Sequence, residues 1–189
     1  MNEQIQSELK KIYNSRYSIS ESTRATYSRG EDTYDPILSQ AVVFPETNEE
    51  VSKTLLLCNH HKVPVVPFGT GTSLEGNVVG NEEGITISLE KMNKILSVNV
   101  EDFDCRVQAC VTKEQLNEYL REDGVFFPID PGANAAIGGM ASTSASGTMA
   151  VKYGTMKTVI TGLTVVLPNG EIIRTGGRTK KTSAGYNLT

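Results

Sequence analysis

The sequence is poor in the residues that most often carry metal or covalent chemistry. Among its 189 residues there are two histidines, three cysteines and no tryptophan. The cysteines show no C-x-x-C spacing, and Cys105 and Cys110 would face opposite sides of a single strand. His60 and His61 are adjacent, so on a helix they would diverge by about 100°. We therefore expect neither a disulfide framework nor a metal site, and we assign the histidines to a helix end.

Long apolar runs are also absent. No stretch approaches the roughly 18 apolar residues that a membrane-spanning helix needs. Residues 1–14 mix Glu and Lys side chains without the apolar centre of a signal peptide, so we expect a cytoplasmic protein. A hydrophobic content of 38% and a charged content of 21% are typical of a soluble globular chain, forming one domain or two small lobes.

Acidic side chains are scarce in the last part of the chain. The net charge is −4, yet residues 151–189 carry six Lys and Arg side chains against one acidic residue. Nucleic acid is a poor match, because the whole chain is acidic and its aromatic content is 6%. A small anionic ligand or an acidic partner lobe would suit this basic segment, and so would an ordinary solvated face.

Local signals in the first half predict a β-α-β unit. Residues 2–14 have helical spacing, and Ala41–Phe44 indicates a buried strand. The sequence Thr47–Glu50 forms a capping box, in which the Thr hydroxyl and the Glu carboxylate satisfy backbone donors, and the helix runs to about His60. Residues 63–67 are the returning strand. The unit implies parallel pairing with a right-handed crossover.

The second half shows a different pattern. Alternating residues at 85–89 and 104–109 predict strands of a mainly antiparallel sheet. A second capping box at 112–115 opens a helix that stops at Gly124, and residues 126–128 indicate a short strand.

A hairpin is predicted near the end of the chain. Residues 163–167 and 171–174 flank the turn sequence Pro168-Asn169-Gly170. The predicted fold class is α+β, with a small, largely parallel lobe and a larger mixed one.

The first segment that could bind a ligand is residues 67–76, with the sequence PFGTGTSLEG. Its glycines let consecutive backbone amides turn inward as a nest for an anion such as a diphosphate, and its hydroxyls add donors. No Gly-Lys-Ser/Thr follows, which excludes a Walker A loop, and Leu74 occupies the third glycine position of G-x-G-x-x-G. An ordinary mobile loop is the alternative.

The second segment is residues 130–147, with the sequence DPGANAAIGGMASTSASG. Its small side chains would let a large flat ligand lie against the backbone. Close helix packing without a ligand would use the same composition. Residues 151–156 would place a tyrosine and a basic residue next to this segment.

The order of these segments is more specific than either alone. A strand with the P-x-G-T-G-T-S loop, the D-P-G-A…I-G-G-M-A-S-T…S-G segment, Y-G-T-M and a hairpin with L-P-N-G-E resemble a known family of flavin-binding domains. That family is the FAD-binding domain of the vanillyl-alcohol oxidase/p-cresol methylhydroxylase (PCMH) type. The sequence is most similar to its D-lactate dehydrogenase (cytochrome) and glycolate oxidase flavoprotein subunit branch.

The resemblance covers roughly residues 35–189, with residues 1–34 as a preceding helical segment. It implies a two-lobed α+β domain, with a small parallel β-α-β lobe and a larger mixed or antiparallel sheet flanked by helices. It also implies bound FAD, non-covalent because neither segment contains His, Cys or Tyr.

The resemblance assigns both segments to the cofactor. The residues that would hold the FAD diphosphate are Pro67, Gly69, Thr70, Gly71, Thr72, Ser73 and Leu74. Those that would line the diphosphate, the ribityl chain and the flavin ring are Pro131, Gly132, Ile137, Gly138, Gly139, Ala141, Thr143, Ser146 and Gly147.

The implied reaction is oxidation of a 2-hydroxyacid such as D-lactate or glycolate, by hydride transfer to flavin N5. The electrons would leave to a cytochrome, a quinone or a partner flavoprotein, with possible peripheral membrane or subunit association. In this family the histidine base and the metal ligands belong to a C-terminal substrate-binding portion, so we assign no catalytic residue here. A stand-alone flavin-binding module and a relative with another substrate are the alternatives.

The chain stops after Asn187-Leu188-Thr189, without a helix cap or a closing strand. We interpret this as truncation, and expect the fragment to be inactive alone.

Overall fold

The computed structural model describes residues 3–189, which divide into two compact units. The first unit comprises the chain up to Met92 together with Val166–Ile172. The second comprises Asn93–Val165 and Ile173–Thr189. Each unit has a hydrophobic core of its own.

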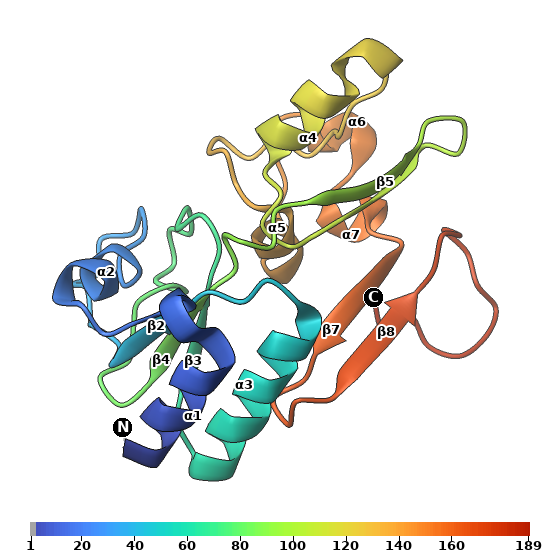
Figure 1. Ribbon diagram of the computed structural model, residues 1–189. Helices are drawn as coiled ribbons and strands as arrows, with labels where there is room; N and C mark the ends of the chain where they lie inside the picture. Colours follow the sequence, from blue (N-terminus) through green and yellow to red (C-terminus); the bar gives the residue numbers. More distant parts are fainter. Residues whose placement is uncertain (1–2) are drawn as a thin grey trace. The chain divides into compact units, whose positions relative to one another are not determined.

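The first unit is built on a four-stranded sheet in the order β1-β2-β4-β3 (Figure 1). Its strands are β1 (Tyr17–Ser18), β2 (Ala41–Val43), β3 (Val65–Phe68) and β4 (Ile85–Ser88). Strands β2, β4 and β3 run parallel, and β1 is an antiparallel edge strand. The predicted parallel β-α-β unit is confirmed, with β4 inserted between its two strands.

The prediction for residues 85–89 was wrong in one respect. Strand β4 pairs in parallel with both neighbours, instead of joining an antiparallel sheet, and every residue in it is buried. The alternation of Ile and Thr suggested a half-exposed strand. Thr86 can be buried because its hydroxyl donates a hydrogen bond to the Ser39 hydroxyl (2.9 Å).

Helices α1 (Glu3–Tyr13) and α3 (Asn48–His61) lie side by side on this sheet (Figure 1). From α1, Ile5, Leu9 and Tyr13 pack in one core cluster with Val43 of β2 and Cys58 of α3. The predicted N-terminal helix therefore contributes directly to the core of the first unit. The short 3-10 helix η1 (Asn14–Arg16) follows α1, and α2 (Glu21–Thr26) follows β1.

Helix α3 begins and ends as predicted. The Thr47 hydroxyl accepts the amide hydrogen of Glu50 (3.2 Å). The Glu50 carboxylate accepts from the Glu46 amide (2.8 Å) and from the Thr47 backbone, and it also binds the Arg16 guanidinium. This ion pair lowers the pKa of Glu50 and joins η1 to the start of α3. The helix ends at His61, in agreement with the assignment of both histidines to a helix end.

A buried hydroxyl joins α1 to α3. The Tyr13 hydroxyl lies 2.6 Å from that of Thr54 and donates to the Glu50 carbonyl (3.2 Å), and burial raises the Tyr13 pKa to about 12.

Replacing Tyr13 with phenylalanine should lower the free energy of unfolding by about 1 kcal/mol, the typical value of one hydrogen bond. Urea denaturation measures this. The control is Tyr34→Phe, because Tyr34 is 59% exposed; this substitution should change the free energy of unfolding by less than about 0.5 kcal/mol. Equal effects of the two substitutions would contradict the prediction.

The second unit contains a hairpin and four short helices. Strands β5 (Ile95–Asn99) and β6 (Asp104–Val107) pair antiparallel. Strand β6 matches the strand predicted at residues 104–109, whereas its partner β5 was not predicted. Its helices are α4 (Lys113–Leu120), α5 (Ile137–Ser142), α6 (Ala150–Tyr153) and α7 (Met156–Val159). Thr112 caps α4 through the Gln115 amide (3.2 Å), and a 3-10 turn, η2 (Arg121–Asp123), leads to Gly124 at φ 69°.

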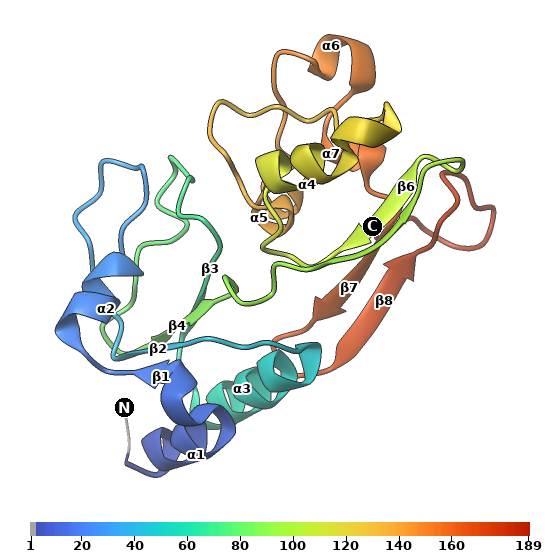
Figure 2. The same ribbon diagram turned by 45° about the horizontal axis from the view of Figure 1, so that its top comes forward.

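The predicted C-terminal hairpin is confirmed. Strands β7 (Gly162–Val166) and β8 (Ile172–Gly176) form a two-stranded sheet, seen in red in Figure 2. The turn end of this hairpin belongs to the first unit, where the Ser52 hydroxyl donates to the Gly170 carbonyl.

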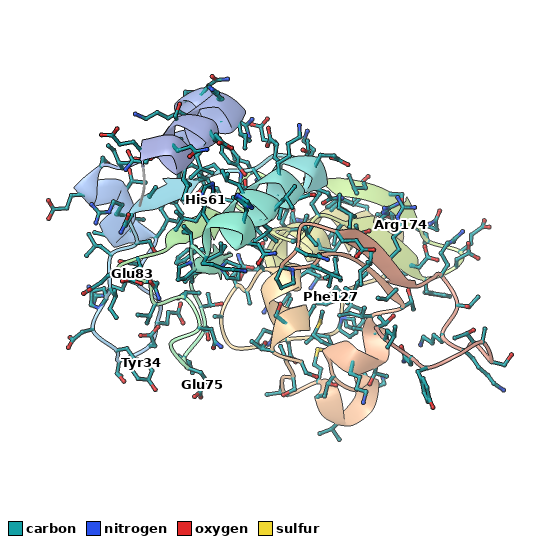
Figure 3. All side chains as sticks on the ribbon, turned by 90° about the horizontal axis from the view of Figure 1, so that it is seen from below. Tyr34, His61, Glu75, Glu83, Phe127 and Arg174 are labelled. Atoms are coloured by element: carbon teal, nitrogen blue, oxygen red, sulfur yellow. The ribbon has the colours of Figure 1, made fainter. Side chains whose placement is uncertain are left out.

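Residues 126–128 do not form the predicted strand. The side chain of Asn117 takes the place of a neighbouring strand, because it accepts from the Phe127 amide (2.6 Å) and donates to the Phe127 carbonyl (3.2 Å). The amide and the carbonyl of Phe127, a residue labelled in Figure 3, are thus both hydrogen-bonded without pairing to another strand. Within residues 3–189, no helix is both long and apolar enough to cross a membrane.

Candidate functional site

The loop of residues 67–76 leaves the end of β3 in the first unit. Gly71 is buried and has φ 74°, a conformation that disfavours other residues. A Cβ at this position would also lie 2.9 Å from the Phe68 ring. Conformation and space therefore both require glycine at position 71.

The backbone amides of this loop are available to a ligand. Within the part of the chain that the structure describes, the amides of residues 71–74 donate to no protein acceptor. The loop's hydroxyls lie close by: those of Thr70 and Thr72 are 3.4 Å apart, and that of Ser73 donates to Asn77 (2.6 Å). Consecutive unpaired amides are the donor set that binds phosphate oxygens, so the loop fits a diphosphate.

The remaining predicted residues of the loop differ in exposure. Leu74 is 67% exposed, and Pro67 is also exposed, although it belongs to β3 and pairs in register with Ile87. Gly69 is half-buried just beyond the strand end.

The segment of residues 130–147 lies in the second unit and contains α5. The Ile137 amide donates to Val111 O and the Gly138 amide to Ala109 O, both at 2.8 Å. A Cβ on Gly138 would lie 2.8 Å from the Ala109 Cβ and 2.9 Å from its carbonyl oxygen. Gly138 is therefore required for close packing, which is the alternative explanation of the small residues.

Two other glycines of this segment have no such packing reason. A Cβ on Gly132 or Gly139 would meet no atom within 4 Å, and both residues are exposed. The absence of side chains there leaves open space beside the backbone. A flat ligand can approach the chain closely at these two positions.

The side chains of this segment are divided between core and surface. Ile137 and Ala141 pack against the core clusters of the second unit, whereas Ser146 is exposed. The Thr143 hydroxyl donates to the Gly139 carbonyl (3.1 Å), so toward a ligand its oxygen can act as an acceptor. The Pro131 carbonyl accepts from the Lys113 ammonium group (3.4 Å).

Asp130 is a functional candidate that the sequence reasoning did not single out. Its carboxylate accepts hydrogen bonds from the Thr148 hydroxyl (2.6 Å) and the Met149 amide (3.0 Å), and these bonds lower its pKa. A carboxyl group with a lowered pKa keeps these bonds above its ordinary pKa and loses them as the pH falls through the lowered value. Asp130 therefore joins the two ends of the segment at neutral pH. Its place at the start of D-P-G-A was the only available signal.

Of residues 151–156, Met156 is hydrogen-bonded to the segment. The Met156 amide donates to Ala145 O (2.9 Å). The Lys152 ammonium group lies 4.9 Å from the centre of the Tyr153 ring. The Tyr153 ring contacts the Phe126 ring edge-on, with 5.5 Å between the two ring centres. These side chains thus engage each other and Phe126.

With this geometry in view, residues 39–176 match a family described as the FAD binding domain. The chain belongs to this family of FAD-binding domains. Its cofactor is FAD, and the unpaired amides of the loop and the open glycines of the second segment suit that molecule.

Similar curated proteins are named as D-lactate dehydrogenases and a glycolate oxidase subunit. The FAD-binding domain is 47% identical over 152 residues to D-lactate dehydrogenase (cytochrome), mitochondrial, of Arabidopsis thaliana, covering 80% of this chain and 27% of the relative. It is 36% identical over 168 residues to the glycolate oxidase subunit GlcD of Bacillus subtilis, covering 88% and 36%. The chain thus spans about a third of the length of these relatives.

Solved structures show the same fold. An alkyldihydroxyacetonephosphate synthase superposes with a TM-score of 0.85 at 22% identity, over 100% of this chain and 36% of that one. A p-cresol methylhydroxylase with substrate bound superposes with a TM-score of 0.78 at 25% identity, over 92% and 35%. The expected α+β fold of the PCMH type is confirmed.

Proposed function

We propose that this domain is the FAD-binding part of a flavin-dependent dehydrogenase that oxidises a 2-hydroxyacid such as D-lactate or glycolate. The observation that carries the proposal is the run of unpaired amides at residues 71–74, in a chain 47% identical to a D-lactate dehydrogenase. The substrate class is taken from the named relatives. The likeness to the alkyldihydroxyacetonephosphate synthase, at 22% identity, supports the fold alone.

In this proposal the chain's own residues bind and orient the cofactor. The amides of residues 71–74 hold the diphosphate, and the residues named above in 131–147 accommodate the ribityl chain and the ring. Bound FAD supplies an acceptor for two electrons. The binding is non-covalent, since neither segment contains His, Cys or Tyr.

The rest of the reaction is assigned to other groups. The two histidines end α3 and leave no base to name, so we propose that this chain alone does not turn over D-lactate. We further propose a cytoplasmic location and, for the parent enzyme, transfer of electrons to a cytochrome, a quinone or a partner flavoprotein.

The proposal is tested by purifying the chain, denaturing it and identifying any flavin released, then titrating the apoprotein with FAD. We expect a visible flavin spectrum, release of FAD on denaturation, and no bleaching by D-lactate. A protein with no measurable affinity for FAD would contradict the proposed function, and rapid bleaching by D-lactate would contradict the absence of a base.

A substitution at Gly139 tests the second segment in the same titration. Because a Cβ there meets no protein atom within 4 Å, Gly139→Ala should not lower the melting temperature of the apoprotein. It should raise the Kd for FAD about fivefold, equivalent to roughly 1 kcal/mol, because the methyl group occupies space proposed for the cofactor. Gly177→Ala, also without neighbours within 4 Å, is the control. An unchanged Kd would remove Gly139 from the site.

A further inference from the structure

Residues 29–34 lie along the cofactor loop, although they precede the matched region at residues 39–176. Figures 1 and 2 both show the loop after α2 beside the loop after β3. The Glu31 amide donates a hydrogen bond to the Gly71 carbonyl (2.9 Å). This bond joins a segment without any recognisable motif to the centre of the proposed diphosphate nest.

Gly30 permits this contact for steric reasons. A Cβ on Gly30 would lie 2.7 Å from Cγ2 of Val78, 2.6 Å from Oδ2 of Asp32 and 3.0 Å from the Gly71 carbonyl oxygen. Each distance is shorter than an ordinary van der Waals contact, so a larger residue would push the two segments apart.

A second contact lies at the tips of the two loops. The ring of Tyr34 covers Gly76 so closely that a Cβ there would lie 2.8 Å from the ring. Figure 3 shows Tyr34 beside Glu75 at this point. The Tyr34 amide donates to Asp32 Oδ1 (3.0 Å), which gives residues 32–34 a tight turn. The contact between the two segments therefore extends from Gly71 to Gly76.

The bond from Glu31 determines the direction of an amide in the nest. The Gly71 carbonyl and the Thr72 amide belong to one trans peptide unit, in which the C=O and N–H groups point in opposite directions. Holding the carbonyl against Glu31 therefore turns the Thr72 amide away from residues 29–34. This amide is one of those that have no protein acceptor among the described residues.

We propose that Gly30 and Glu31 are positioning residues for the FAD diphosphate: they hold the Gly71–Thr72 peptide so that the Thr72 amide faces the cofactor. The inference rests on the proposed function of the loop, and it assigns a role to a segment outside the matched family region.

The test compares Glu31→Pro with Glu31→Ala. Both variants lose the carboxylate, but only proline removes the backbone amide that binds Gly71. Relative to Glu31→Ala, we expect Glu31→Pro to weaken binding of ADP and of FAD about 3- to 10-fold, the effect of losing one hydrogen bond. Gly30→Ala keeps the Glu31 amide and should weaken ADP binding in the same direction.

An NMR measurement separates positioning from general destabilisation. In ¹⁵N-labelled wild-type protein, ADP should shift the Thr72 amide resonance and leave that of Glu31 nearly unchanged; in Glu31→Pro the shift of Thr72 should shrink. The wild-type experiment tests the inference even if a variant fails to fold, because an unshifted Thr72 amide resonance in ADP-bound protein overturns the inference. Equal ADP affinity of folded Glu31→Pro and Glu31→Ala would also overturn it. If the wild type binds neither ADP nor FAD, the proposed function itself is wrong.

Discussion

Replacing Gly147 with alanine should weaken FAD binding by about 10- to 100-fold, the effect expected from overpacking a tight contact by roughly 1–3 kcal/mol. A Cβ on Gly147 would lie 2.2 Å from both the carbonyl oxygen and Oδ1 of Asp130. The backbone would have to move away, and the bonds from Thr148 and Met149 to Asp130 would be lost with it. Because the φ angle of Gly147 is not positive, the expected weakening of FAD binding has a steric cause and not a conformational one.

The measurement is a titration of the apoprotein with FAD, followed by flavin fluorescence. Gly177→Ala is the control, since its Cβ meets nothing within 4 Å. Thr148→Val provides a milder variant, which removes the hydroxyl bonded to Asp130 without overpacking, and should weaken FAD binding about 3- to 10-fold. Wild-type affinity in both Gly147→Ala and Thr148→Val would show that the Asp130 contact does not support the cofactor site.

Replacing Leu9 with alanine should lower the free energy of unfolding of the first unit by about 2–5 kcal/mol, the range for truncating a buried leucine. Leu9 is 0% exposed and packs in the same cluster as Ile85 and Ile87 of β4. The helix that carries it precedes the matched family region, yet its apolar face is part of the core. Urea denaturation followed by circular dichroism measures the change.

Ser7→Ala is the matched control, because Ser7 is exposed on the same helix and its replacement should change stability by less than about 0.5 kcal/mol. The comparison also bears on the predicted boundary between residues 1–34 and 35–189. If Leu9→Ala is as stable as Ser7→Ala, residues 35–189 do not depend on α1, and the first 34 residues can be treated as a separate segment.

Elements with local signals were predicted well. Thr47 and Thr112 cap helices where expected, because an N-cap needs only a hydroxyl and an amide three residues later. The hairpin of β7 and β8 likewise follows from its turn sequence. In each case the interacting groups lie within a few residues of each other in the chain.

Non-local partners account for the errors. The pairing of β4 depends on two strands distant in the sequence, and the burial of Thr86 depends on Ser39. The backbone of Phe127 is satisfied by the Asn117 side chain of α4, which no strand signal in residues 126–128 could reveal. Residues 29–34 have no hydrophobic period, so their contact with the loop was not predictable.

The loop of residues 67–76 and the segment of residues 130–147 were recognisable from the sequence because a nest for an anion and a close approach to a flat ring both require runs of glycine and other small residues. Which glycines serve packing and which leave space was decided only by the tertiary structure. Gly138 packs against Ala109, whereas Gly139, its neighbour in the chain, faces open space. The same composition satisfies both needs, and only the atoms brought near by folding distinguish them.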